Sequence, residues 1–294
     1  MPTIVPGPSF EDRPLPHPDE PPFDQGLQFD IETLIDRRRV LKAIGFGATA
    51  AAIAACVPSG GTSTPAGTTA PAGSGGAAGT AVPAGYTIPE ETAGPFPGDG
   101  SNGPDILNQS GVVRSDIRSS FGSSTTAAAG VPLMIRFTLL DEASAAPLAG
   151  HAVYVWHCDM PGRYSMYSAG VTGENYLRGV QAAGSDGVVT FQSVFPGCYA
   201  GRWPHIHFEV YPSLAKAGDV GNKIATSQIA LPQDSCAQVY ATAGYEQSVA
   251  NLAQVSLQSD MVFGDDGAIH ELGSMSGSIA GGLIVDLTVP VKAA

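Results

Sequence analysis

Short apolar segments separated by turn residues run through the chain from Tyr86 onward. In "PLMIRFTLL", residues 132–140, every second side chain from Leu133 is apolar. Successive side chains of a strand point to opposite faces, so this period of two predicts a strand with one face in a core. No long run shows the period of a helix.

Similar segments recur along this part of the chain, and residues 185–187, "SDG", predict a turn before Val188. We found no internal repeat. The pattern predicts an all-β fold, a β-sandwich whose loops carry the functional side chains. The further predicted strands are "HAVYVWH" (151–157), "VVTF" (188–191), "HIHFEVY" (205–211) and "GGLIVDLTVPV" (281–291).

The N-terminal part of the chain differs in composition from the rest. Residues 57–85 consist of Gly, Ala, Pro, Thr and Ser with a few Val and carry no charge. Such a segment cannot bury enough apolar surface to offset its ordering entropy, which predicts a flexible tether. The folded domain is therefore expected at 86–294, after a disordered N-terminal region.

Residues 1–56 contain the features of a targeting segment. Arg37 and Arg38 precede an apolar run, Ala43–Ala55, which at 13 residues is shorter than the roughly 20 that span a bilayer. The segment resembles a twin-arginine export signal, and "IAAC" resembles a lipoprotein signal in which Cys56 is lipidated. The resemblance implies an exported, extracytoplasmic protein anchored to a membrane by lipid alone. The alternative is a buried helix of a globular domain.

The charge balance narrows the possible partners. The chain has 14 Lys and Arg against 27 Asp and Glu, a net charge of −13. A chain without a basic field is a poor ligand for polyanions, so no nucleic-acid partner is expected.

Two histidines occur one residue apart in "FPGCYAGRWPHIHFEVY", residues 195–211. If 205–211 is a strand, His205 and His207 share one face while Ile206 and Phe208 enter the core on the other. Two imidazoles at this spacing can bind one metal ion. The alternative is a pair of polar residues on an edge strand.

Two tyrosines occupy comparable positions after Pro-Gly pairs, Tyr164 and Tyr199. A phenol with an ordinary pKa of about 10 must lose its proton to bind a metal, and a hard trivalent cation favours that loss. Two tyrosines with two histidines therefore favour ferric iron over zinc or ferrous iron, which more typically take His with Cys or carboxylate.

Three segments together resemble the intradiol ring-cleavage dioxygenases, the family of protocatechuate 3,4-dioxygenase and catechol 1,2-dioxygenase. They are "WHCDMPGRYSMYS", "YLRGVQAAGSDGVVTFQSVFPGCYAGRWPHIHFEV" and "TSQIALP", and the likeness runs from about Pro89 to Val289. It implies a β-sandwich and a non-haem Fe(III) cofactor. By this resemblance Tyr164 and His205 are equatorial ligands, and Tyr199 and His207 axial ones.

The same resemblance implies the reaction and two further site residues. Arg202 matches an arginine beside the substrate, and Gln228 a glutamine that supports the site. The implied activity is cleavage of a catechol-type ring by O2 to a muconate-type diacid, with no organic cofactor. Two alternatives remain: a non-catalytic surface module that binds iron or aromatic ligands, and a ferrous or zinc enzyme.

The remaining aromatic and charged residues near these segments are expected to have structural roles. Glu209 is expected to be exposed or in a salt bridge. The others are expected to pack or to support the site, with Tyr167 a possible pocket residue: His157, Trp156, Trp203, Tyr154, Tyr167 and Tyr176.

The cysteines and the departures from the family pattern give three further expectations. Export permits a disulfide, and Cys198 with Cys236 is the expected pair. The chain lacks the helical dimerisation region of catechol 1,2-dioxygenases, so its oligomeric state cannot be carried over. The segment 199–205 is shorter than in soluble members, which predicts a pocket open to bulky or surface-presented catechols.

Overall fold

The computed structural model describes β1 (Ser9–Phe10), β2 (Arg13–Pro14) and residues 86–293. The two short strands pair with each other in antiparallel fashion. The predicted signal with Cys56 and the predicted tether at 57–85 lie outside the described residues. They stay predictions.

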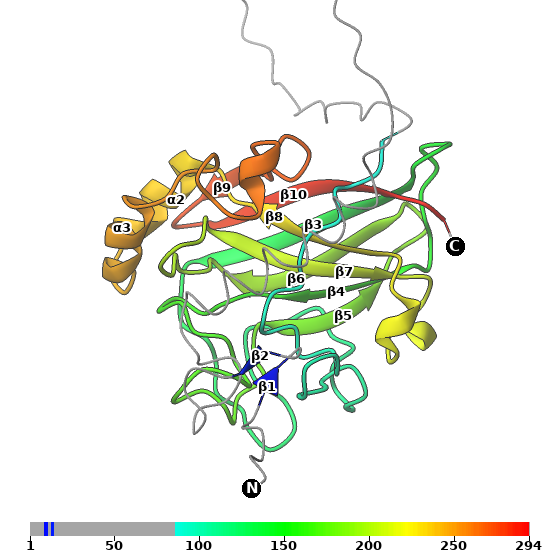
Figure 1. Ribbon diagram of the computed structural model, residues 1–294, viewed down its shortest axis with the longest axis horizontal. Helices are drawn as coiled ribbons and strands as arrows, with labels where there is room; N and C mark the ends of the chain where they lie inside the picture. The colour runs from blue at the N-terminus through cyan, green and yellow to red at the C-terminus, as the bar shows by residue number, and fades with distance from the viewer. Residues whose placement is uncertain (1–8, 11–12, 15–85, 294) are drawn as a thin grey trace, which may run out of the picture.

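Two four-stranded sheets make up the body of the fold, in the orders β6-β3-β10-β9 and β5-β4-β7-β8. Neighbouring strands are antiparallel except β3 and β10, which are parallel. The predicted β-sandwich is confirmed (Figure 1). The strands are β3 (Pro132–Asp141), β4 (Ala152–Trp156), β5 (Arg178–Ala182), β6 (Val188–Val194), β7 (His205–Tyr211), β8 (Ala225–Ala230), β9 (Ser274–Ser278) and β10 (Gly282–Val291).

The main core lies between the two sheets. In β3 the alternation predicted from the sequence holds, because Ile135 and Phe137 are fully buried while Arg136 between them is exposed. Ile206 and Phe208 of β7 enter the same core from the facing sheet. Burial of these side chains is the main favourable term in folding and fixes the register of β7.

A second apolar cluster covers the outer face of the β5-β4-β7-β8 sheet. It combines side chains of β4 and β7 with loop residues between 93 and 121 and between 164 and 167. The sheet is therefore buried on both faces, and all seven residues of β7 are buried. Polar side chains on this second face sit in a low-dielectric layer, where their pKa values depart from the usual ones.

Helical segments are short and were not predicted. α2 (Gln233–Tyr240) and α3 (Glu246–Leu252) lie next to each other at one end of the sheets (Figure 1). Single 3-10 turns occur at η1 (Leu214–Lys216), η2 (Val220–Asn222) and η3 (Phe263–Asp265). Among the helices of residues 86–293, none has the length and apolar character needed to cross a membrane.

Glu271 is a buried carboxyl whose titration predicts a pH-dependent stability. Its pKa is raised from 4.5 to about 8, chiefly by burial and then by the nearby charges of Glu91, Asp266 and Asp265. The folded protein therefore binds more protons than the unfolded chain between these values. The stabilising contribution is complete below about pH 4.5 and is lost as the pH rises through about 8.

Glu271→Gln should leave the free energy of unfolding nearly unchanged at pH 5 and raise it at pH 8.5, measured by urea titration. An equal change at both pH values would contradict this assignment.

Candidate metal centre

The register of the covered sheet brings four side chains into one row. Trp156 of β4 lies opposite Arg178 of β5 and opposite His207 of β7, and His207 lies opposite Gln228 of β8. Directly paired residues point to the same face of a sheet. His205, two residues before His207, shares that face, so the strand delivers both imidazoles to the loop-covered side.

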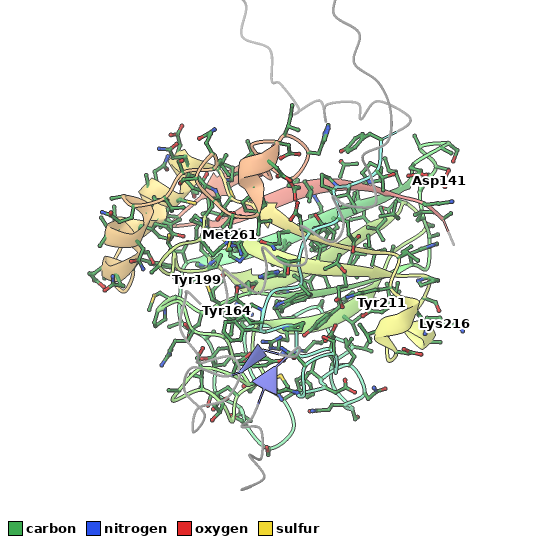
Figure 2. All side chains as sticks on the ribbon, viewed as in Figure 1. Asp141, Tyr164, Tyr199, Tyr211, Lys216 and Met261 are labelled. Carbon is green, nitrogen blue, oxygen red and sulfur yellow. The ribbon has the colours of Figure 1, made fainter. Side chains whose placement is uncertain are left out.

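Four donor atoms from three segments of the chain meet beside this row. The His205 Nε2 atom lies 3.1 Å from the His207 Nε2 atom, 3.1 Å from the Tyr199 hydroxyl oxygen and 3.4 Å from the Tyr164 hydroxyl oxygen. The two tyrosine rings meet edge to face with centroids 5.9 Å apart, and Figure 2 shows both near the same end of the sheet. All four residues of the predicted ligand set are therefore brought together.

Hydrogen bonding fixes the tautomer of His205. Its Nδ1–H donates to the carbonyl oxygen of Trp203 at 2.5 Å, so its Nε2 carries a lone pair directed at the other three groups. One lone pair cannot satisfy His207 and two phenols together. The Nδ1 atom of His207 is buried and has no hydrogen-bond partner in the described structure. The set is under-satisfied as a hydrogen-bond network.

The pKa values of these groups are shifted so that each group is neutral in the metal-free protein. Burial, and then the nearby Arg202 charge, holds the pKa of His205 well below its usual 6.5. Burial raises the pKa of Tyr199 to about 12 and that of Tyr164 well above 10. Neutral imidazoles are the form that binds a metal. The phenols need a strong cation to become phenolates.

A single ion fits this donor set. Two ligand atoms at about 2.1 Å from a shared ion and at right angles to each other are about 3 Å apart, close to the separations around His205. A trivalent cation would satisfy the converging lone pairs and stabilise both phenolates. Among residues 86–293, no group of three or more His, Cys, Asp or Glu could hold a metal. The site is instead built from two histidines and two tyrosines.

Arg202 lies beside the donor set as a buried, fixed cation. Its Nε donates to Asp260 Oδ2 at 2.9 Å, and its Nη2 donates to Gln228 Oε1 at 2.7 Å. Gln228 is held in turn, because its Nε2 donates to the carbonyl oxygen of Thr92. Burial alone would lower the pKa of Arg202, but Tyr199 and Asp260 outweigh it, and the net pKa is raised. The guanidinium is charged at every physiological pH.

Residues 88–98 form a strap across the site that sequence analysis did not identify. The ring of Phe96 lies 4.9 Å from that of Tyr164. A Cβ atom added to Gly94 would lie 3.3 Å from the His207 Cε1 atom, and Gly94 has φ +69°, which favours glycine. A larger residue there would press on the imidazole. Within this segment, Gly94-Pro95 and Pro97-Gly98 are the local signals of a turn.

The residues expected to have structural roles do so. The indole of Trp156 stacks on His207 with centroids 4.9 Å apart and an interplanar angle of 5°. His157 bonds Ser193 and the Cys158 carbonyl oxygen rather than joining the donor set.

The other aromatic and acidic residues hold the surrounding loops. Trp203 supports the site through its backbone, whose carbonyl oxygen accepts from His205 and whose N–H donates to Asp260. Glu209 is fully buried, in a salt bridge with Lys223 at 3.1 Å. Three further tyrosines donate hydrogen bonds from their hydroxyl groups to loop residues: Tyr154 to Pro97, Tyr167 to Asn102 and Tyr176 to Asp159.

The expected disulfide between Cys198 and Cys236 is wrong, because both are free thiols. The Cys198 Sγ atom lies 3.6 Å from the Arg202 carbonyl oxygen, while Cys236 is buried on α2. Burial raises the pKa of Cys198 to about 12 and that of Cys236 further. Disulfide formation requires a thiolate, which both sites disfavour.

Comparisons with known proteins agree with this geometry. A family model described as Dioxygenase matches residues 102–205, a segment that contains Tyr164, Tyr199 and Arg202 and ends at His205. No curated protein sequence matches the chain.

Solved structures also resemble this chain. An intradiol ring-cleavage dioxygenase from Tetranychus urticae superposes with a TM-score of 0.57 at 22% identity, over 71% of this chain and 95% of that one. The dioxygenase domain of a carbohydrate-binding fusion protein from Streptomyces sp. SirexAA-E gives 0.46 at 20% identity, over 71% and 100%. Catechol 1,2-dioxygenase from Pseudomonas arvilla C-1 gives 0.43 at 18%, over 71% and 63%. The first of these similarities shows the fold, and with the family match it supports a dioxygenase enzyme.

Proposed function

We propose that this protein is a non-haem Fe(III)-dependent intradiol dioxygenase that cleaves the ring of a catechol-type substrate with O2 to a muconate-type diacid. The observation that carries the proposal is the convergence of two phenol oxygens and the His207 Nε2 atom within 3.1–3.4 Å of the His205 Nε2 atom. Two phenolates and two neutral imidazoles suit a hard trivalent ion.

The proposed ligands are Tyr164, Tyr199, His205 and His207. Bound ferric iron would supply the Lewis acidity and electron-accepting capacity that make a chelated catecholate reactive toward O2. The supporting groups are those of the chain itself. Trp203 fixes the tautomer of His205 through its carbonyl oxygen, and Trp156 holds the plane of His207 by stacking.

The chain also provides a base and a fixed positive charge. The hydroxyl oxygen of Tyr199 belongs to a side chain that is more exposed than Tyr164, so it is the better placed of the two to accept a proton from a substrate hydroxyl. Arg202 is held by Asp260 and Gln228 and stabilises negative charge that develops on the substrate. The strap at 88–98 lies against His207 through Gly94 and would exclude water from that side.

The proposed substrates are catechols with bulky or surface-presented substituents. The short segment 199–205 supports this, since a shorter loop leaves more room beside Arg202. The same protein is proposed to be exported by the twin-arginine route and held at a membrane through a lipid on Cys56, which the sequence of residues 37–56 supports. The twin-arginine route carries folded proteins, and a metalloenzyme can therefore bind its metal before it is exported.

The purified full chain should contain one iron per chain and be wine-red, because ferric phenolates absorb visible light. With a catechol it should consume one O2 per ring, and mass spectrometry with ¹⁸O2 should place both oxygen atoms in a diacid. A panel of substituted catechols would identify the substrate class. A colourless preparation replete with iron would exclude the phenolate ligands. Colour without oxygen uptake would favour an iron-binding module instead.

A further inference from the structure

Asp260 is a buried carboxylate that sequence analysis did not identify. It precedes η3 in the segment between α3 and β9, and its side chain is fully buried. The Oδ2 atom accepts hydrogen bonds from Arg202 Nε at 2.9 Å and from the Trp203 backbone N–H at 2.6 Å. The Oδ1 atom accepts from the backbone N–H groups of Val262 and Phe263 at 2.8 and 3.1 Å. Both oxygens are therefore used as acceptors.

These bonds determine where the Arg202 guanidinium lies. Its Nε is directed to Asp260 and its Nη2 to Gln228, and within residues 86–293 no side chain or carbonyl accepts from its Nη1. The Phe263 ring lies against the same guanidinium, 5.8 Å from its central carbon. A planar group held at two edges and on one face has a fixed orientation. The remaining edge is free for a ligand.

Stability alone does not explain this ion pair. Burial of two charges costs several kcal/mol, and apolar replacements of buried pairs are often neutral or stabilising. The pair lies next to the donor set, since Asp260 also binds the N–H of Trp203, whose carbonyl oxygen orients His205. The ion pair therefore lies at the edge of the donor set, where a cation of fixed orientation can act on a bound substrate.

We propose that Asp260 is the positioning residue of the site: it orients Arg202 so that the free Nη1 edge faces the substrate. The proposal rests on the proposed dioxygenase activity for its kinetic consequence, but the orientation itself is a property of the metal-free chain. Asp260 touches neither substrate nor metal and acts through Arg202.

Asp260→Asn is the sharpest variant because it changes one atom. An amide presents one acceptor and one donor, whereas all four groups around Asp260 are N–H donors. Either Arg202 or the backbone N–H groups must then face an NH2 group. The guanidinium loses its anchor while the shape of the site is kept. Asp265→Asn is the matched control, because it removes the same negative charge from an exposed residue of the same segment.

The first measurement uses metal-free protein and does not depend on activity. The Nε–H of Arg202, followed by NMR with isotope-labelled arginine, should exchange slowly with water in the wild type and in Asp265→Asn. It should exchange at least tenfold faster in Asp260→Asn. Fast exchange in the wild type, or slow exchange in all three proteins, would overturn the proposal whatever the protein catalyses.

The second measurement is kinetic. A displacement of about 1 Å at a catalytic group costs roughly 10²-fold, so kcat of Asp260→Asn should fall by about that factor at unchanged iron content and visible spectrum. In an Arg202→Gln background the same substitution should have no further effect on kcat, because Asp260 acts through Arg202. Equal losses in both backgrounds, or a loss of thermal stability at unchanged kcat, would assign a purely structural role.

If Asp260→Asn does not fold, Asp260→Glu keeps the charge and both acceptor oxygens but shifts them by one methylene. It should show a smaller loss of kcat and intermediate Nε–H exchange. Wild-type kinetics and exchange in this variant would contradict the proposal. Absence of iron or of oxygen uptake in the wild type would instead remove the proposed function and leave the exchange result standing.

Discussion

Replacement of Tyr164 by phenylalanine should lower the affinity for iron by more than about 100-fold. Loss of a group that merely supports a metal ligand costs 10- to 100-fold in affinity, and loss of a ligand should cost more. The substitution removes only a hydroxyl, so the contacts of the ring with Phe96 and Tyr199 are kept. Burial raises the pKa of this phenol well above its usual value, so a bound trivalent cation is needed to hold it as a phenolate. Iron per chain after dialysis against a buffered iron solution measures the effect.

Tyr167→Phe is the matched control for this experiment. Its ring lies in the same apolar cluster, 5.3 Å from that of Phe96, and its hydroxyl bonds Gly98 and Asn102 rather than the donor set. This variant should lose stability but keep one iron and the red colour. If Tyr164→Phe kept both iron and colour, the phenolate ligation proposed here would be wrong.

The sandwich was accessible to sequence analysis because its signal is local. In β3 and β7 the apolar side chains recur with a period of two, and that period alone determines which face meets the core. For β7 even the bounds, 205–211, were predicted. The pair of histidines was accessible for the same reason, since alternation places His205 and His207 on one face.

The supporting groups were not accessible because they depend on contacts between distant segments. Asp260 is 58 positions from Arg202, and nothing in "QSDMVFG" distinguishes it from a turn residue. The strap at 88–98 reaches the site only because the covered face of the sheet packs against it. α2 and α3 span 8 and 7 residues, too short for a clear helical period.

The expected disulfide failed for a related reason. Export and the positions of Cys198 and Cys236 along the chain say nothing about the direction of each thiol. The structure places Cys198 against the carbonyl oxygen of Arg202 and keeps both cysteines in the apolar interior. Pairing requires matched geometry at both ends, which spacing cannot supply.

Arg178 links the strap to the sheet, and its bonds explain how a loop can cover the site. Its Nη1 donates to the carbonyl oxygen of Pro97 at 2.7 Å, and its Nη2 donates to those of Phe96 and Ser165 at 2.9 and 3.0 Å. The side chain is 1% exposed, in register with Trp156 at the start of the row that ends at Gln228. One buried cation therefore satisfies three loop carbonyl oxygens.

Arg178→Met should consequently lower the free energy of unfolding by about 3–5 kcal/mol, since a buried acceptor left without a donor costs about 1–3 kcal/mol. The carbonyl oxygens of Phe96 and Ser165 would lose their donor, whereas that of Pro97 keeps the Tyr154 hydroxyl. The midpoint of urea unfolding should fall, with metal-free protein used to separate folding from iron binding. Arg163→Met removes a guanidinium that is 44% exposed and paired with Asp159, so it should cost no more than about 1 kcal/mol. Equal losses in the two variants would mean that the strap is held by its apolar contacts, chiefly Phe96 on Tyr164, rather than by hydrogen bonds to Arg178.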